Sequence, residues 1–128
     1  MIRIVSSGGR WGWLVAVVAL AGCSSKTSPT PQMTPATTIT ITSTGANPKS
    51  VQIALGSRVL FVNNDTREHE MGSDPHPDHT DCPVINQVGL LQPGQQRETG
   101  NFVVVRTCGY HDHEDPTNPL WQGTIITK

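Results

Sequence analysis

The sequence predicts an all-β sandwich, because short alternating segments separated by turn residues dominate the chain from residue 37 onward. Residues 38–42 (TITIT) alternate β-branched apolar and hydroxyl side chains, as a strand with one buried face does. Turn-forming residues interrupt the pattern at 45–48 (GANP) and 92–95 (QPGQ). Many short strands with turns between them are typical of a β-sandwich.

The remaining strands follow from the same reasoning. Val51, Ile53 and Leu55 restart the alternation after the first turn. Residues 59–62 (VLFV) form a continuous apolar run that suits a strand covered on both faces. Two further strands are expected at 102–105 (FVVV) and 124–127 (TIIT).

Residues 69–88 show no clear period and are expected to form a long loop. Loops of this length in a compact domain are usually functional or disordered. This one carries many side chains that can bind a metal, which favours a functional loop: His69, Met71, Asp74, His76, His79, Asp81 and Cys82.

The N-terminus predicts export. Arg3 and Arg10 precede an apolar run at 11–20, which is too short to span a bilayer and ends in small residues. The quartet Leu20-Ala21-Gly22-Cys23 resembles the bacterial lipobox, which implies a signal peptide at 1–22 and a lipid on Cys23. The protein is then expected on a membrane facing the periplasm, with Ser24 favouring the outer membrane. An ordinary signal peptide with an unmodified cysteine is the alternative.

The rest of the chain divides into a tether and one domain. Residues 23–36 are rich in Ser, Thr and Pro, which indicates an extended linker, and residues 37–128 form the folding unit. A net charge of −1 with no basic stripe argues against a nucleic-acid partner. No phosphate-binding loop or activated nucleophile is visible, so an enzyme is not expected. The domain is expected to be a monomer.

All five histidines fall between positions 69 and 113, in two groups. Imidazole is the commonest metal ligand in proteins, so this concentration predicts a metal site rather than polar surface loops. Asp112, Glu114 and Asp115 are expected to form a solvated rim around the second group.

Four segments together resemble the cupredoxin family, the blue copper proteins that include plastocyanin and azurin: VLFVNNDTREH (59–69), LQPGQ (91–95), TCGYH (107–111) and GTI (123–125). The resemblance implies a cupredoxin-like Greek-key β-sandwich that binds copper through His69, Cys108 and His111. It also implies single-electron transfer to an unknown redox partner, with no catalysis.

Two features depart from the family pattern. Trp121 occupies the position where family members usually place the axial methionine. Met71, the one methionine in residues 37–128, is a candidate soft ligand, although a packed side chain is the preferred interpretation.

The second departure is Cys82. Two thiols in an oxidising compartment favour a Cys82–Cys108 disulfide, whereas the resemblance favours a Cys108 thiolate, which is the preferred interpretation. A third arrangement places both sulfurs near copper. The disulfide would leave a nitrogen-rich site suited to Cu(II) or Zn²⁺, as in a periplasmic metal carrier, with candidate ligands His69, His76, His79, His111 and His113. A disulfide-stapled interaction domain without metal is the remaining alternative.

Overall fold

The structure is a computed structural model that describes residues 8–9 and 37–128. The expected tether (23–36), the lipidation site Cys23 and nearly all of the expected signal peptide (1–22) lie outside the described residues. Within the described part, no helix is both long and apolar enough to cross a bilayer.

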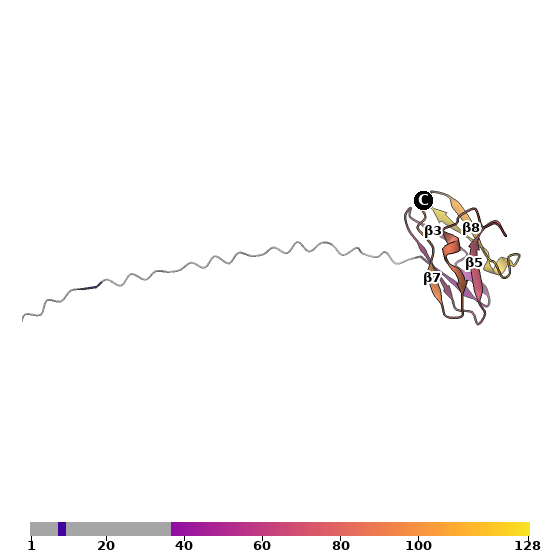
Figure 1. The fold of residues 1–128 in the computed structure, drawn as a ribbon, viewed down its shortest axis with the longest axis horizontal. Helices are drawn as coiled ribbons and strands as arrows, with labels where there is room; N and C mark the ends of the chain where they lie inside the picture. The colour runs from indigo at the N-terminus through magenta and orange to yellow at the C-terminus, as the bar shows by residue number, and fades with distance from the viewer. Residues whose placement is uncertain (1–7, 10–36) are drawn as a thin grey trace, which may run out of the picture. The chain divides into compact units, whose positions relative to one another are not determined.

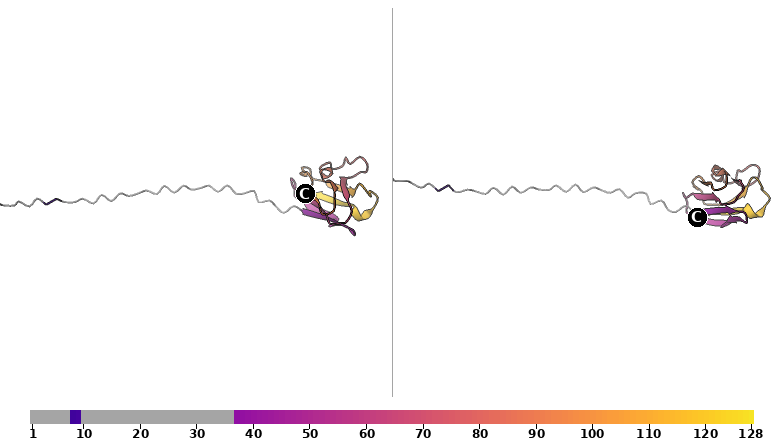
Figure 2. Two further views of the ribbon diagram at one scale, coloured as in Figure 1. Left: turned by 60° about the horizontal axis from the view of Figure 1, so that its bottom comes forward. Right: turned by 90° about the horizontal axis from the view of Figure 1, so that it is seen from below.

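Residues 37–128 form two sheets packed face to face, as Figures 1 and 2 show. The first sheet has the strand order β2-β1-β4-β7 and the second has the order β3-β9-β8-β5-β6. The strands are β1 (Thr37–Thr42), β2 (Gly45–Asn47), β3 (Ser50–Ile53), β4 (Val59–Asn63), β5 (His69–Ser73), β6 (Gly89–Leu91), β7 (Gln96–Glu98), β8 (Thr107–Asp112) and β9 (Gly123–Thr127). Two 3-10 turns, η1 (Ile85–Gln87) and η2 (Pro119–Trp121), complete the described elements.

The chain crosses repeatedly between the two sheets, and each sheet contains one parallel pair. β1 runs parallel to β4, and β3 runs parallel to β9, while the other pairs are antiparallel. The expected all-β sandwich is confirmed.

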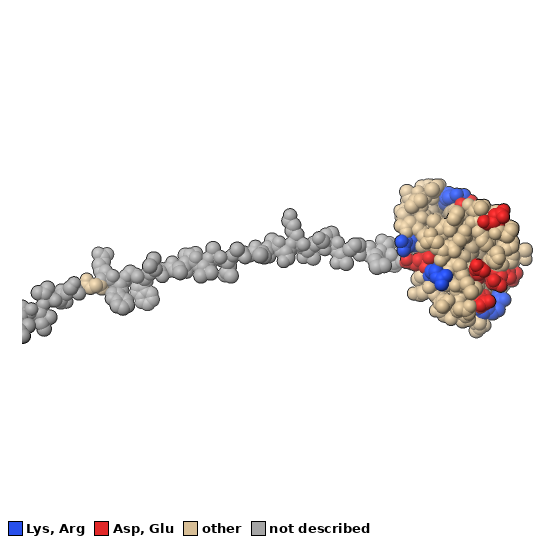
Figure 3. Space-filling view, in the orientation of Figure 1, with Lys and Arg blue, Asp and Glu red and all other residues tan. Residues whose placement is uncertain are grey.

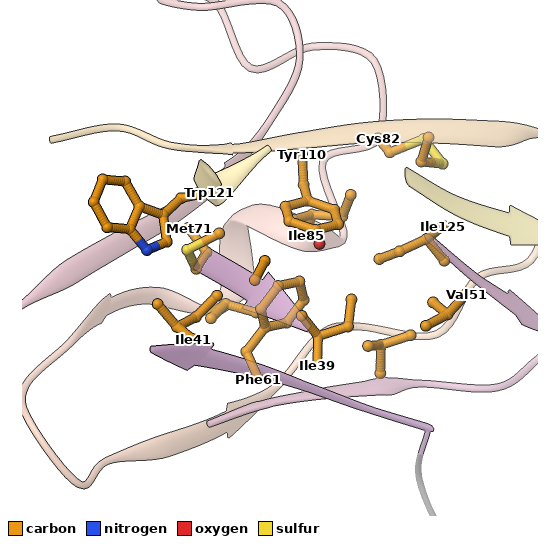
Figure 4. Close-up of a cluster of buried hydrophobic side chains, with 14 of the residues drawn as sticks. Ile39, Ile41, Val51, Phe61, Met71, Cys82, Ile85, Tyr110, Trp121 and Ile125 are labelled. Carbon is orange, nitrogen blue, oxygen red and sulfur yellow. A yellow bond between two sulfur atoms is a disulfide. The ribbon is translucent and has the colours of Figure 1, made fainter. Parts of the chain in front are cut away.

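The core lies between the sheets and follows from the alternation of the strands. Ile39 and Ile41 of β1 and Phe61 of β4 face inward from one sheet, and all three are fully buried. Tyr110 of β8 meets Phe61 edge-on, with ring centroids 5.3 Å apart. Figure 4 shows Trp121 at one end of this core and Cys82 at the other.

Two expected elements were wrong. Residues 102–105 do not form a strand, because only Phe102 reaches the core while the three valines after it stay exposed. The strand that follows the 92–95 turn and β7 is β8, which the sequence pattern did not identify. The segment expected to be one long loop begins with β5, which alternates too briefly for its period to be recognised. Met71 on β5 is buried in the core, as its preferred interpretation predicted.

Candidate metal centre

Cys108 is bonded to Cys82 in a disulfide, with the two Cα atoms 5.8 Å apart. A disulfide sulfur carries no thiolate charge and cannot be the soft ligand of a blue copper centre. The preferred thiolate interpretation was therefore wrong, as was the arrangement with two sulfurs near copper. The disulfide alternative describes this chain.

His69 is fully buried, and carboxylates face both of its ring nitrogens. Nδ1 lies 2.7 Å from Asp112 Oδ2, and Nε2 lies 3.0 Å from Asp65 Oδ2. An imidazole protonated on both nitrogens would donate to both carboxylates. The hydrogen bond from His69 is the main cause that lowers the pKa of Asp65 below its ordinary value, against the opposing effect of burial. A metal ion at His69 would have to displace one of these carboxylates.

The register of β8 explains why Cys108 does not approach His69. Cys108, Tyr110 and Asp112 point to the interior of the sandwich, and Asp112 is the one that reaches the imidazole. Cys108 lies four residues earlier, which is about 13 Å along a strand. The expected solvated position of Asp112 was wrong, because β8 continues past His111 and buries this side chain.

Trp121 closes the same end of the core above His69. Its ring centroid lies 5.2 Å from that of His69, and its Nε1 donates to the carbonyl oxygen of Thr42 at 3.0 Å. The Arg67 guanidinium also lies over the Trp121 ring, with its Cζ 4.6 Å from the ring centroid. A buried imidazole in contact with two carboxylates beneath an indole, with no free sulfur, does not fit a copper–thiolate group.

A different constellation does fit a metal. His76 and His79 on the loop after β5, together with His111 and His113 at the end of β8, each offer one nitrogen, and these four atoms lie within 4.8 Å of one another. We call them the four-histidine site. Three of the four were secondary candidates from the sequence, and His69 is the one histidine outside the site.

The nitrogen separations match those of metal ligands. His79 Nε2 lies 3.2 Å from His111 Nε2 and 3.1 Å from His113 Nδ1. Two imidazoles that bind one ion at about 2.0–2.1 Å in a tetrahedral arrangement have nitrogens about 3.3–3.4 Å apart. The His76 ring stands 4.7 Å from that of His113, centroid to centroid. The site therefore needs only small side-chain adjustments to hold an ion.

Asp74 orients His111. Its Oδ1 lies 2.7 Å from His111 Nδ1, which leaves Nε2 directed at His79. A carboxylate on the second ring nitrogen is the common way in which proteins fix a metal-binding imidazole. Asp74 is itself held against β8, because its backbone amide donates to the carbonyl oxygen of Gly109 at 3.1 Å.

Two glycines leave space on the outer face of the second sheet for the loop that follows β5. Gly72 on β5 pairs with His111 on β8, and a β-carbon at Gly72 would lie 3.2 Å from the His79 ring. A β-carbon at Gly109 would overlap the Asp74 carboxylate. Glycine at these two positions leaves room for the His79 ring and the Asp74 carboxylate against the sheet.

His79 is held in an uncommon backbone conformation, with a φ of 52°. Asn86 holds it there, since its amide donates to the His79 carbonyl at 2.9 Å while its Oδ1 accepts from the Ser73 amide at 2.8 Å. Burial, followed by the three neighbouring imidazoles, lowers the pKa of His79. A lowered pKa keeps this imidazole neutral, which is the form that binds a metal.

Asp112 also places His113. Its Oδ1 accepts from the backbone amides of Glu70 at 3.0 Å and Glu114 at 3.1 Å, and the His113 amide donates to the Glu70 carbonyl at 2.6 Å. Asp112 thus contacts His69 inside the sandwich and also holds the turn that places His113 on the outside.

The sequence analysis singled out the histidines and named Asp74 among the candidate metal-binding side chains, but it did not identify the other groups that support the site. Gly72, Gly109 and Asn86 have no chemical signature that marks them as part of a metal site. Asp74 stands two residues before His76, and this proximity was the one available signal.

Comparison with solved structures identifies similar folds. The chain is similar to a purple cupredoxin from Nitrosopumilus maritimus, with 19% identity, a TM-score of 0.56, and coverage of 72% of this chain and 99% of that one. It is also similar to a reduced amicyanin variant, with 14% identity, a TM-score of 0.57, and coverage of 73% of this chain and 83% of that one. No protein-family model and no curated protein sequence matches the chain.

Proposed function

Because the domain has the cupredoxin fold, we propose that it binds one copper ion, as Cu(II), at the four-histidine site. The convergence of four imidazole nitrogens within 4.8 Å carries this proposal. His76, His79, His111 and His113 would hold the ion, and Asp74 would fix the orientation of His111.

The donor set favours copper in its oxidised state. Imidazole nitrogen suits Cu(II) and Zn²⁺, and among divalent first-row ions copper binds such a site most tightly. No sulfur is among the four ligands, and soft sulfur is what stabilises Cu(I). The ion would therefore be held mainly as a divalent cation, and Zn²⁺ is the competing occupant.

Coordination by four protein ligands favours transport or buffering of the metal over catalysis. Four protein ligands fill a tetrahedral shell, whereas catalytic sites keep a position open for water or substrate. The exposed position of His76 and the part-exposed positions of His79 and His113 would allow an ion to enter and leave from solvent. We propose a metal carrier or buffer rather than an enzyme.

A location at the cell envelope, on a membrane and facing the periplasm, belongs to the same proposal. The export segment at 1–22 and the lipobox ending in Cys23 support it. The Cys82–Cys108 disulfide supports it independently, since structural disulfides persist in oxidising compartments. Ser24 after the lipidated cysteine favours the outer membrane.

Metal titration followed by electron paramagnetic resonance tests the proposed site. The wild-type chain should bind one Cu(II) with hyperfine structure from several nitrogens and without an intense Cu(II)–thiolate visible band. The double variant His79→Ala/His111→Ala should lose this site. Asp78→Asn, which changes an exposed carboxylate on the same loop, is the matched control and should keep a stoichiometry of one. An intense thiolate band, or equal affinity in the double variant, would contradict the proposal.

Single-electron transfer is the second candidate function, and the cupredoxin fold is the observation that favours it. Voltammetry separates it from carriage. A carrier needs no reversible Cu(II)/Cu(I) couple, so a fast reversible couple at the four-histidine site would favour electron transfer.

A further inference from the structure

Exposed large apolar side chains gather at one end of the domain. Among the described residues six such side chains are exposed, and four of them belong to two neighbouring loops: Leu55 at 52%, Val103 at 71%, Val104 at 58% and Val105 at 64%. We call these four residues the end patch. A cluster of exposed apolar residues usually marks a surface that contacts another molecule or a membrane.

Backbone hydrogen bonds hold the two loops together. The Gly56 amide donates to the Phe102 carbonyl at 2.7 Å, and the Phe102 amide donates to the Ser57 carbonyl at 3.0 Å. The Leu55 amide donates to the carbonyl of the C-terminal residue, Lys128, at 3.1 Å. The end patch therefore adjoins the C-terminus, which is marked in Figures 1 and 2.

The domain also begins at this end. Thr37, the first residue of β1, pairs with Val59, the first residue of β4. The Val59 carbonyl accepts from the amide of Thr99, on the segment that leads to Val103. The end patch is thus beside the point where the chain from Cys23 enters the sandwich.

Basic side chains stand around the end patch. Arg58, Arg106 and Lys128 are exposed near these loops, and two of them pair with carboxylates: Arg58 with Glu98 at 3.3 Å, and Arg106 with Asp81. On the face drawn in Figure 3, charged side chains of both signs are scattered and most of the surface is neither acidic nor basic. Exposed apolar side chains beside basic ones suit the boundary between acyl chains and headgroups, with the apolar contact as the main contribution.

Resting on the proposed location at the cell envelope, we propose that the end patch contacts the lipid bilayer to which a lipid on Cys23 would anchor the chain. Residues 24–36 can span at most about 43–47 Å, at about 3.3–3.6 Å per residue, so the patch stays within reach of the anchoring surface. Attachment through a short tether raises the effective concentration of the surface, so a weak apolar contact suffices to orient the domain.

The proposed orientation directs the four-histidine site away from the membrane. β8 starts at Thr107, next to the end patch, and ends at Asp112, between two of the ligands. The docked domain would leave the metal site open to the aqueous side. The contact with lipid involves no metal, so its failure would leave the proposed copper site standing.

Paramagnetic broadening from the lipid surface tests the orientation. The full-length lipidated chain, methyl-labelled, is placed in lipid nanodiscs of phosphatidylethanolamine and phosphatidylglycerol that contain a headgroup-linked gadolinium chelate. Methyl signals of Leu55, Val103, Val104 and Val105 should broaden several-fold more than those of Leu90 and Leu120, which are exposed apolar residues elsewhere.

A triple variant and a control complete the test. Val103→Ser/Val104→Ser/Val105→Ser changes only exposed side chains and should abolish the difference in broadening between Leu55 and Leu120. Leu120→Ser should keep the strong broadening of Leu55. Equal broadening of Leu55 and Leu120 in the wild type would assign the patch to another occupant, such as a second copy of the chain, and overturn the proposal. An unchanged pattern in the triple variant would also overturn it.

Discussion

The disulfide between Cys82 and Cys108 is the covalent link between the two halves of the four-histidine site. Cys82 ends the loop that carries His76 and His79, and Cys108 lies on the strand that carries His111. The cross-link removes loop freedom from the unfolded chain and also limits how far the loop can move from the strand.

Replacing both cysteines by alanine should therefore weaken both the fold and the site. The two cysteines are 26 residues apart in the sequence. Removing the cross-link frees the unfolded chain and should lower the unfolding free energy by about 3–4 kcal/mol. Chemical denaturation measures this term, and copper titration of the folded variant should show weaker binding. Stronger copper binding in the wild type after reduction would instead indicate that a released thiolate is a ligand.

Gly109→Ala should lower metal affinity while leaving stability nearly unchanged. The new methyl group would overlap the Asp74 carboxylate, which is the flexible end of a half-exposed side chain and can turn aside. His111 then loses the group that orients it, and loss of such a partner typically costs 10–100-fold in metal affinity. Calorimetric titration with Cu(II) measures the change.

A second pair of variants isolates the cause of the Gly109 effect. Asp74→Asn should weaken copper binding to a similar degree, and adding Gly109→Ala to it should produce little further loss. Asp78→Asn, an exposed carboxylate on the same loop, is the matched control and should bind as the wild type does. Additive losses in the double variant would contradict an effect that acts through Asp74.

Asp65→Asn should make the stability of the domain less sensitive to acid. The folded pKa of Asp65 is lowered, mainly by the hydrogen bond with His69, so its contribution is present above the unfolded pKa of about 4 and is lost as the pH falls through the folded value. Unfolding free energies measured from pH 6 down to pH 2 should fall less steeply in the variant. The variant should also be less stable than the wild type at neutral pH, because the carboxylate that lies 3.0 Å from His69 Nε2 is lost.

Met71→Leu should leave copper binding unchanged. Met71 is 1% exposed and packs in the core, so a residue of similar volume should cost less than about 1.5 kcal/mol of unfolding free energy. The copper affinity and resonance spectrum should match those of the wild type. A changed spectrum would show that the thioether reaches the ion.

The sequence pattern identified β1 and β4 correctly. Alternating apolar residues indicate a strand with one buried face, and a short apolar run indicates a strand inside the protein. The apolar run at 102–105 led to a wrong strand prediction because composition alone was used. Its valines have the composition of a buried strand, but the loop holds them outside the sandwich. The concentration of histidines indicated a metal site, since that observation does not depend on how the loop folds.

The amino-acid sequence by itself determined the sandwich and the presence of metal-binding side chains, because these depend on local period and composition. Only the tertiary structure decided which side chains meet. A strand alternates its faces, so the pairing of β8 with β5 turns Asp112 inward to His69 and His111 outward to His79. The fold of the 74–82 loop then places Cys82 on Cys108, and that contact between distant residues cannot be read from either segment alone.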